Sequence, residues 1–275
     1  MLAEIPEDQA TGRVAALYDR IRAESGSSLV NFVWRHLATI DGAAEWGWSV
    51  ARLNGDEESI SSVSETADGE AQSIVERATG VAPLDLGREG RIIVEIYNRN
   101  NAANLFRMAV IKAALTGAAD VLEGAVPCGP AAPPQDRSRI PPLPSAEQLG
   151  DGDAACIERL GAAGPASDTG IPPSLWRHLA VVPGGIEQVA GAVTPLLGGR
   201  LFRRAYDRLR SRADELARRR PVAVPGAATF DRRAALDGVE RFYDRIGELT
   251  LAGRLVALLD SEGSAPHNSA MARKV

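Results

Sequence analysis

The sequence predicts an all-α fold built from two tandem copies of one helical domain, which pair as a pseudo-dimer. Apolar residues recur at helical spacing along most of the 275 residues, and no alternating run long enough for a strand interrupts them. The duplication rests on the residues Trp-Arg-His-Leu-Ala at 34–38, which return at 176–180. Shorter matches flank this repeat in the same order on both sides, so coincidence is a poor explanation. A period this long describes two domains rather than a solenoid.

The first copy is expected over residues 1–123. Its first helix carries one apolar stripe, because Val14, Leu17, Tyr18 and Ile21 fall at i, i+3, i+4 and i+7. Residues 54–70 are polar and weakly patterned, so no helix is expected over most of that stretch. The predicted helices cover 7–23, about 32–40, 43–53, 69–78 and 91–115.

A linker is expected at 124–150, because the seven prolines in this stretch are incompatible with a regular element. The second copy is expected over 151–260 and repeats the plan of the first. Its predicted helices cover 152–162, 173 to a break at 183–185, then up to about 197, 199–219 and 232–259. Residues 261–275 are expected to form a disordered tail.

The composition argues against several classes of protein. A net charge of −5 disfavours nucleic acid as the main partner, because a phosphate-binding surface needs an excess of basic residues. Cys128 and Cys156 form no C-x-x-C motif and have no histidine beside them, which disfavours a metal site or a peroxidase-like thiol enzyme. The N-terminus lacks a signal-peptide core, and no stretch is apolar enough to span a bilayer. We therefore expect a cytoplasmic protein with no cofactor, no metal and no membrane partner.

Three short sequence motifs carry a resemblance to a known family: Arg-His-Leu-Ala-Thr at 35–39, Tyr-Asn-Arg-Asn-Asn-Ala-Ala-Asn-Leu at 97–105 and Tyr-x-Arg at 243–245. Together with the order of elements, they resemble the group I DL-2-haloacid dehalogenases, also named the halocarboxylic acid dehydrogenase family, over roughly residues 10–260. The resemblance implies two all-α repeats with the active site between them, and a homodimer. It also implies hydrolysis of short 2-haloalkanoic acids. An Asp would activate a water that displaces the halide directly, without a metal or a covalent intermediate.

The resemblance also implies which residues bind the substrate carboxylate and its apolar end. Phe32 corresponds to a pocket wall, Asn98 and Asn101 to hydrogen-bond donors, and Tyr243 to a cavity residue. Ser174 takes the family's serine position near the start of the second repeated helix. Asn98 and Asn101 are three residues apart and would share one helix face.

The catalytic aspartate has more than one candidate position. In the family it follows a serine, and Ser167-Asp168 is the Ser-Asp pair in this neighbourhood, so residue type selects Asp168. The register of the repeated Trp-Arg-His-Leu-Ala segment instead puts Leu175 in the aspartate position, after Ser174, and a leucine cannot accept a proton. Asp244, the second-copy partner of Asn98, is a third candidate if it faces the seam between the copies.

Two functions stay open at this point. The first is a hydrolytic 2-haloacid dehalogenase, and the second is an inactive relative that binds a small carboxylate or apolar ligand between the repeats. An Asp carboxylate that points into the cavity between the copies would favour the first. His36 and His178 occupy equivalent places in the two copies and are expected to be structural.

Overall fold

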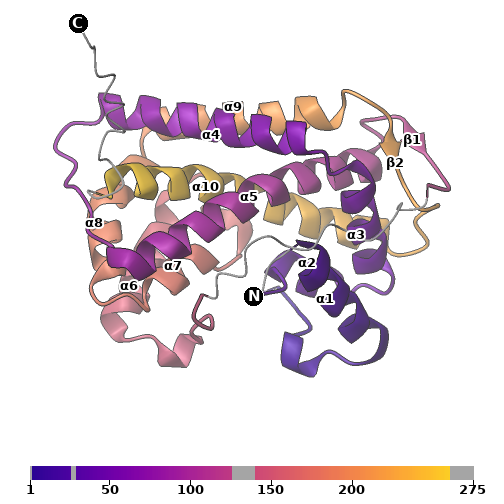
Figure 1. The fold of residues 1–275 in the computed structure, drawn as a ribbon, viewed down its shortest axis with the longest axis horizontal. Coiled ribbons are helices and arrows are strands. Elements are labelled where there is room, and N and C mark those ends of the chain that lie inside the picture. Colours follow the sequence, from indigo (N-terminus) through magenta and orange to yellow (C-terminus); the bar gives the residue numbers. More distant parts are fainter. Residues whose placement is uncertain (1, 26–28, 126–139, 261–275) are drawn as a thin grey trace, which may run out of the picture.

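The computed structural model describes residues 2–25, 29–125 and 140–260, and within them the fold is all-α, as predicted (Figure 1). The helices of the first half are α1 Gly12–Ser25, α2 Phe32–Leu37, α3 Ala43–Asn54, α4 Glu57–Arg77 and α5 Gly87–Thr116. Those of the second half are α6 Asp151–Ala163, α7 Ser174–Leu179, α8 Gly185–Leu197, α9 Arg200–Ala217 and α10 Arg232–Leu259. The remaining elements are the 3₁₀ turns η1 Glu7–Gln9, η2 Ala146–Gln148 and η3 Ser167–Thr169, and the strands β1 Val121–Leu122 and β2 Val222–Ala223.

Helices α5 and α10 form the centre of the molecule, where they make its most extensive helix–helix contact (Figure 1). Helices α4 and α9 pack against each other and cover one edge of this central pair. Helices α1 to α3 gather at one end of the opposite edge and α6 to α8 at the other end. The short helices α2 and α7 thus lie on the same side of the central pair, one from each half.

Helix α4 begins well before the helix predicted at 69–78. Asp56 caps it, because its carboxylate accepts a hydrogen bond from the backbone N–H of Ser59 at 2.7 Å. The buried face of the helix consists of Val63, Ala67, Ala71 and Ile74. The spacing of these residues is helical, but the alanines make the apolar stripe too weak to recognise from the sequence.

Short parallel backbone pairings join the two halves at the ends of the central helices. Strand β1 follows α5 and pairs with β2, which precedes α10. Leu84 precedes α5 and forms a parallel bridge with Asp260, which follows α10. Each half therefore binds the end of the long helix of the other half. The tandem duplication that would account for this reciprocity stays a prediction.

Buried apolar side chains from both halves form one connected core. The domains expected at 1–123 and 151–260 therefore share an interior. Within the expected linker, residues 126–139 lie outside the described residues, as does the expected tail at 261–275. The described end of the linker packs on the second half, where the carbonyl of Pro144 accepts a hydrogen bond from Arg177. Among the described helices, none has both the length and the hydrophobicity to cross a membrane.

Candidate functional site

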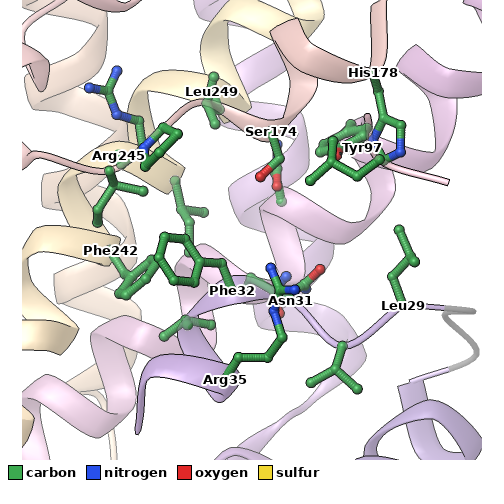
Figure 2. A pocket seen from close by; sticks show the side chains of 18 of the residues that line it. Leu29, Asn31, Phe32, Arg35, Tyr97, Ser174, His178, Phe242, Arg245 and Leu249 are labelled. Carbon is green, nitrogen blue, oxygen red and sulfur yellow. Dashed lines mark hydrogen bonds between the residues drawn. The ribbon is translucent and has the colours of Figure 1, made fainter. Parts of the chain in front are cut away.

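A cavity of about 100 Å³ lies between the two halves (Figure 2). Helices α2 and α7 contribute residues to its lining, and α5 and α10 contribute their central turns. The connection before α2 and the segment before α7 complete it. This central cavity is therefore built from elements of both halves.

One side of the central cavity, the polar wall, is formed by α5 and α7. Its members are Tyr97, Asn101, Asn104, Ser174 and His178. Tyr97 Oη lies 2.5 Å from Nδ1 of His178, and the His178 Nε2 lies 3.1 Å from the carbonyl of Pro141. A carbonyl only accepts, so Nε2 carries the proton and the Tyr97 hydroxyl donates to Nδ1. This pair joins α5 of the first half to α7 of the second.

The polar wall is uncharged near neutral pH. Burial lowers the pKa of His178 to about 4, and the nearby Arg177 lowers it further, while the hydrogen bond to Pro141 opposes the shift. Burial also raises the pKa of Tyr97, against the positive charges of Arg177 and Arg35. Asn101 adds an unmet hydrogen-bonding need, because its Nδ2 is buried and has no partner.

The other side of the central cavity, the apolar wall, is formed by α2 and α10. Its members are Phe32, Phe242, Ile246 and Leu249. The rings of Phe32 and Phe242 meet edge to face with centroids 5.1 Å apart, which fixes α2 against α10. Phe242 also contacts the ring of His36, at a centroid distance of 5.8 Å. An apolar ligand group would find its contacts on this side.

A buried ion pair supports the apolar wall from behind. Arg245 lines the cavity, but its guanidinium head turns away from Ser174 (Figure 2) and lies 2.6 Å from the carboxylate of Glu248. Glu248 is fully buried, and its Oε2 accepts a hydrogen bond from the N–H of Ala166 at 2.8 Å. Burial raises the pKa of Glu248, and Arg245 opposes this rise. A Cβ on Gly164 would lie 2.1 Å from Glu248 Oε2, so only glycine leaves room for the carboxylate.

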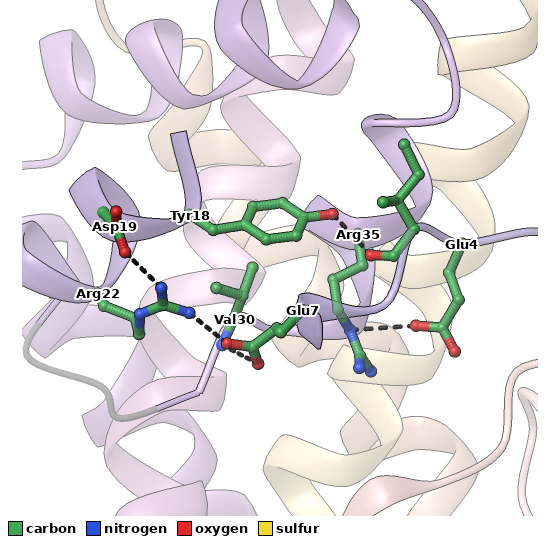
Figure 3. A network of polar contacts seen from close by, with 8 residues as sticks. Glu4, Glu7, Tyr18, Asp19, Arg22, Val30 and Arg35 are labelled. Atoms are coloured by element: carbon green, nitrogen blue, oxygen red, sulfur yellow. Dashed lines mark hydrogen bonds and ion pairs between the residues drawn. The ribbon is translucent and has the colours of Figure 1, made fainter. Parts of the chain in front are cut away.

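The N-terminal segment brings charge to the cavity lining (Figure 3). Arg35 of α2 lines the cavity, and its Nε lies 3.1 Å from Glu4 Oε2, within ion-pair distance but outside hydrogen-bond geometry. Glu7 also lines the cavity. Its Oε1 accepts a hydrogen bond from the N–H of Val30 at 2.9 Å, and its Oε2 pairs with Arg22. A guanidinium and a carboxylate thus face the same space.

The structure brings three of the residues selected from the sequence together: Phe32, Asn101 and Ser174 all line the central cavity. Asn98 does not, because it faces another side of α5 and donates its Nδ2–H to the carbonyl of Gly253 at 3.1 Å. Tyr243 is fully buried away from the cavity, and its hydroxyl donates to the carbonyl of Arg210 at 2.8 Å. Phe242, one position earlier, contacts His36 as Tyr97 contacts His178. These two contacts align Tyr97 with Phe242, whereas the sequence match aligns Tyr97 with Tyr243.

None of the candidates for the aspartate position lines the central cavity. Asp168 lies exposed on η3. Asp244 pairs with Arg210 of α9 at 2.6 Å, and burial raises its pKa while Arg210 opposes the shift. Leu175 is fully buried in the first turn of α7 and packs toward Gly253. Glu7 is the carboxylate in the cavity lining among the described residues.

Sequence reasoning missed Arg35, Glu7, Phe242 and the Arg245–Glu248 pair. A signal existed for the pair, because an arginine and a glutamate three residues apart interrupt the apolar end of the last predicted helix. Glu7 carried no such signal, since it is held by tertiary contacts with Arg22 and Val30, which lie 15 and 23 positions further along the chain. Within the described ranges, no group of three or more His, Cys, Asp or Glu side chains is placed to hold a metal ion.

No protein-family model matches the sequence, and no curated protein sequence matches it. Solved structures do resemble the fold. A D-2-haloacid dehalogenase mutant in complex with D-2-CPA has a TM-score of 0.72 at 15% identity, over 93% of this chain and 94% of that one. A second mutant structure gives 0.70 at 15% identity, over 93% and 94%. The same kind of enzyme with L-LA gives 0.72 at 15% identity, over 93% and 95%. The chain therefore has the fold of the D-2-haloacid dehalogenases.

Proposed function

We propose that the central cavity binds a short 2-haloalkanoic acid and that the chain hydrolyses its carbon–halogen bond. One observation carries the binding: two donors, the Arg35 guanidinium and the Asn101 amide, share a small cavity with an apolar wall. The Asn101 Nδ2 is buried without a partner, and an acceptor on a ligand would remove that penalty. A ligand carboxylate would pair with these two donors, and an apolar carbon–halogen group would contact the apolar wall.

The similar structures support this substrate class. They are D-2-haloacid dehalogenases, and two of them are complexes, one with D-2-CPA and one with L-LA. Their resemblance covers nearly the whole of this chain. A likeness of fold alone does not assign a function, so the proposal rests on the lining of this chain's own cavity.

The proposed reaction is a direct displacement. The oxygen of a water forms a bond to the carbon next to the carboxylate, and the halide leaves with the electron pair of the broken bond. A base takes the water proton, and the products are a 2-hydroxy acid and a halide ion. We assign the base to Glu7, because a carboxylate within reach of the water is what this chemistry needs. Its bonds to Val30 and Arg22 hold it in one orientation.

Binding without turnover is the second candidate, and a specific observation favours it. The register of the repeated Trp-Arg-His-Leu-Ala segment puts Leu175 in the family's aspartate position, and Leu175 is fully buried. Glu7, the alternative base, is already paired with Arg22. In that case the same two-sided cavity would hold a short carboxylic acid as a ligand.

We also propose that the halves are two copies of one helical unit, which meet at the central cavity as a pseudo-dimer. The equivalent contacts of Tyr97 with His178 and of Phe242 with His36 support this proposal. The reciprocal pairings at the ends of α5 and α10 support it as well. A homodimer and a cytoplasmic location stay predictions.

Halide release from D- and L-2-chloropropionate, measured beside calorimetric binding of the same acids, tests the proposal. We expect turnover by the wild type and a loss of about 10³-fold in kcat for Glu7→Gln with binding retained. Asp168→Asn and Asp244→Asn serve as matched controls and should leave turnover unchanged. Loss of turnover in either control, with Glu7→Gln active, would overturn the assignment of the base. Binding without halide release would establish the second candidate, and absence of binding would exclude both.

A further inference from the structure

A second cavity, of about 440 Å³, lies among α4, α5 and α10. It is separate from the central cavity, because none of the described residues lines both. Asn98 faces this second cavity, whereas Asn101, less than one helical turn further along α5, faces the central one. The volume is in the range that holds a small organic molecule.

The second cavity can be compared with the place in the other half that the proposed duplication makes equivalent. In the register set by the contacts of Tyr97 and Phe242, the residue equivalent to Asn98 is Tyr243. The Tyr243 ring fills its side of α10, with the Lys112 ammonium 3.9 Å from the ring centre and paired to Asp214 at 2.7 Å. On the α5 side the smaller Asn98 lines the second cavity.

The lining of the second cavity combines cations with a buried, unpartnered acceptor. Asn98 is 4% exposed, and its Oδ1 has no hydrogen-bond partner while its Nδ2 is bound to Gly253. Such an atom calls for a donor such as a hydroxyl group. Three arginines, Arg91, Arg99 and Arg254, line the same space with Glu95 and Asp260.

Arg254 is held by one serine and one exposed carboxylate. Arg254 donates from Nη2 to Ser64 Oγ at 2.6 Å, and its Nε lies 3.0 Å from the exposed Asp68 carboxylate without hydrogen-bond geometry. Burial lowers the pKa of Arg254, which Asp68 opposes. The Asp260 carboxylate already has other partners, because it accepts a hydrogen bond from the N–H of Leu86 and pairs with Arg91. The Arg99–Glu95 pair is largely exposed and therefore weak.

We propose that this second cavity binds a small organic anion that carries a hydroxyl group. Its anionic end pairs with Arg254 and Arg99, and its hydroxyl donates to Asn98 Oδ1. Arginine suits this role because its planar guanidinium binds carboxylate and phosphate oxygens in pairs. The site does not depend on the reaction proposed for the central cavity.

Calorimetric titration of the full chain with glycerol 3-phosphate, inorganic phosphate and glycerol tests this site. We expect saturable binding of glycerol 3-phosphate, weaker binding of phosphate and none of glycerol. Arg254→Gln should weaken the binding by about tenfold or more, which is about 1.4 kcal/mol. Asn98→Ala should remove the advantage of glycerol 3-phosphate over phosphate. Arg99→Gln, a change at an exposed side chain, should also weaken the binding of both anions.

Two control variants keep this test specific. Arg203→Gln removes the same charge from an exposed position on α9 and should bind glycerol 3-phosphate as the wild type does. Arg35→Gln alters only the central cavity and should also leave this binding unchanged. If Arg254→Gln and Arg99→Gln both bind glycerol 3-phosphate as tightly as Arg203→Gln does, the proposal is overturned. Absence of saturable binding, or a loss confined to Arg35→Gln, would overturn it as well.

Discussion

The two walls of the central cavity differ in polarity at positions that the proposed duplication would make equivalent. Helix α7 presents Ser174 where α2 presents Phe32. In the observed register, α5 presents Tyr97, Asn101 and Asn104 where α10 presents Phe242, Ile246 and Leu249. A symmetric cavity would treat both ends of a ligand alike. Because the side chains of the two walls differ, this cavity can orient a molecule that has one polar and one apolar end.

Gly164→Ala tests the support behind the apolar wall and should have the largest effect. The new Cβ would displace the fully buried Glu248 carboxylate, which leaves Arg245 uncompensated. Breaking a buried pair costs about 3–5 kcal/mol, so we expect a loss of this size in the free energy of unfolding, measured with urea. Gly161→Ala is the control, because its nearest neighbour would be the Pro173 Cγ at an ordinary 3.6 Å. Equal midpoints for both variants would show that the pair is dispensable.

Acid should destabilise the protein through the polar wall. The folded-state pKa of His178, about 4, lies below its unfolded value, so the unfolded chain binds the proton first as the pH falls. The stability that neutral His178 provides is present above about pH 6.5 and declines toward pH 4, by up to about 3 kcal/mol. Urea unfolding at both ends of this window should show a smaller decline for His178→Gln than for the wild type. His36→Gln, on α2, should retain the wild-type decline. An equal loss of unfolding free energy with falling pH in all three proteins would contradict the prediction.

Arg35→Gln tests whether Arg35 and Arg177, the arginines of the repeated Trp-Arg-His-Leu-Ala segment, differ in function. Arg35 lines the central cavity, whereas Arg177 does not and donates to Pro144. Loss of a hydrogen bond to a charged group costs about 1.5–3 kcal/mol, so the affinity for 2-chloropropionate should fall about 10- to 100-fold in Arg35→Gln. Arg177→Gln should change it little. A larger loss in the Arg177 variant would reverse the assignment of the anionic end.

Phe32→Ser makes the two walls more alike and should have the smallest effect. Removing the ring costs the apolar end of a ligand about 1–3 kcal/mol of contact, so the preference for 2-chloropropionate over lactate should fall about tenfold. Competition binding of the two acids measures the ratio directly. An unchanged ratio would mean that the halogen-bearing carbon does not face this wall.

The fold was largely predictable because its strongest signals are local. The repeated word lies on α2 and α7, and the helical spacing of apolar residues predicts most of the other helices. The start of α4 was missed because alanines form half of its buried face. Helix existence depends on neighbours along the chain, which a sequence shows directly.

The site was less predictable because it depends on helix rotation. Successive residues of a helix point about 100° apart around its axis. The sequence match was offset by one residue, so it selected Tyr243, which lies outside the central cavity, and missed Phe242. Asn98 and Asn101 share a helix surface by spacing, yet a helix packed on both sides presents them to different cavities. Glu7 and Arg35 come together only through tertiary contacts that no short motif records.

The reciprocal pairings at the ends of α5 and α10 have a consequence for how the chain can be divided. Each half completes its edges with backbone groups from the other half, so a fragment on its own would expose unpaired amides and a large part of the shared core. Two fragments separated between Ala125 and Ile140 should be insoluble when produced singly and should reassemble when produced together. The molecule is thereby a natural candidate for a complementation reporter, whose recovered signal would report association of its parts.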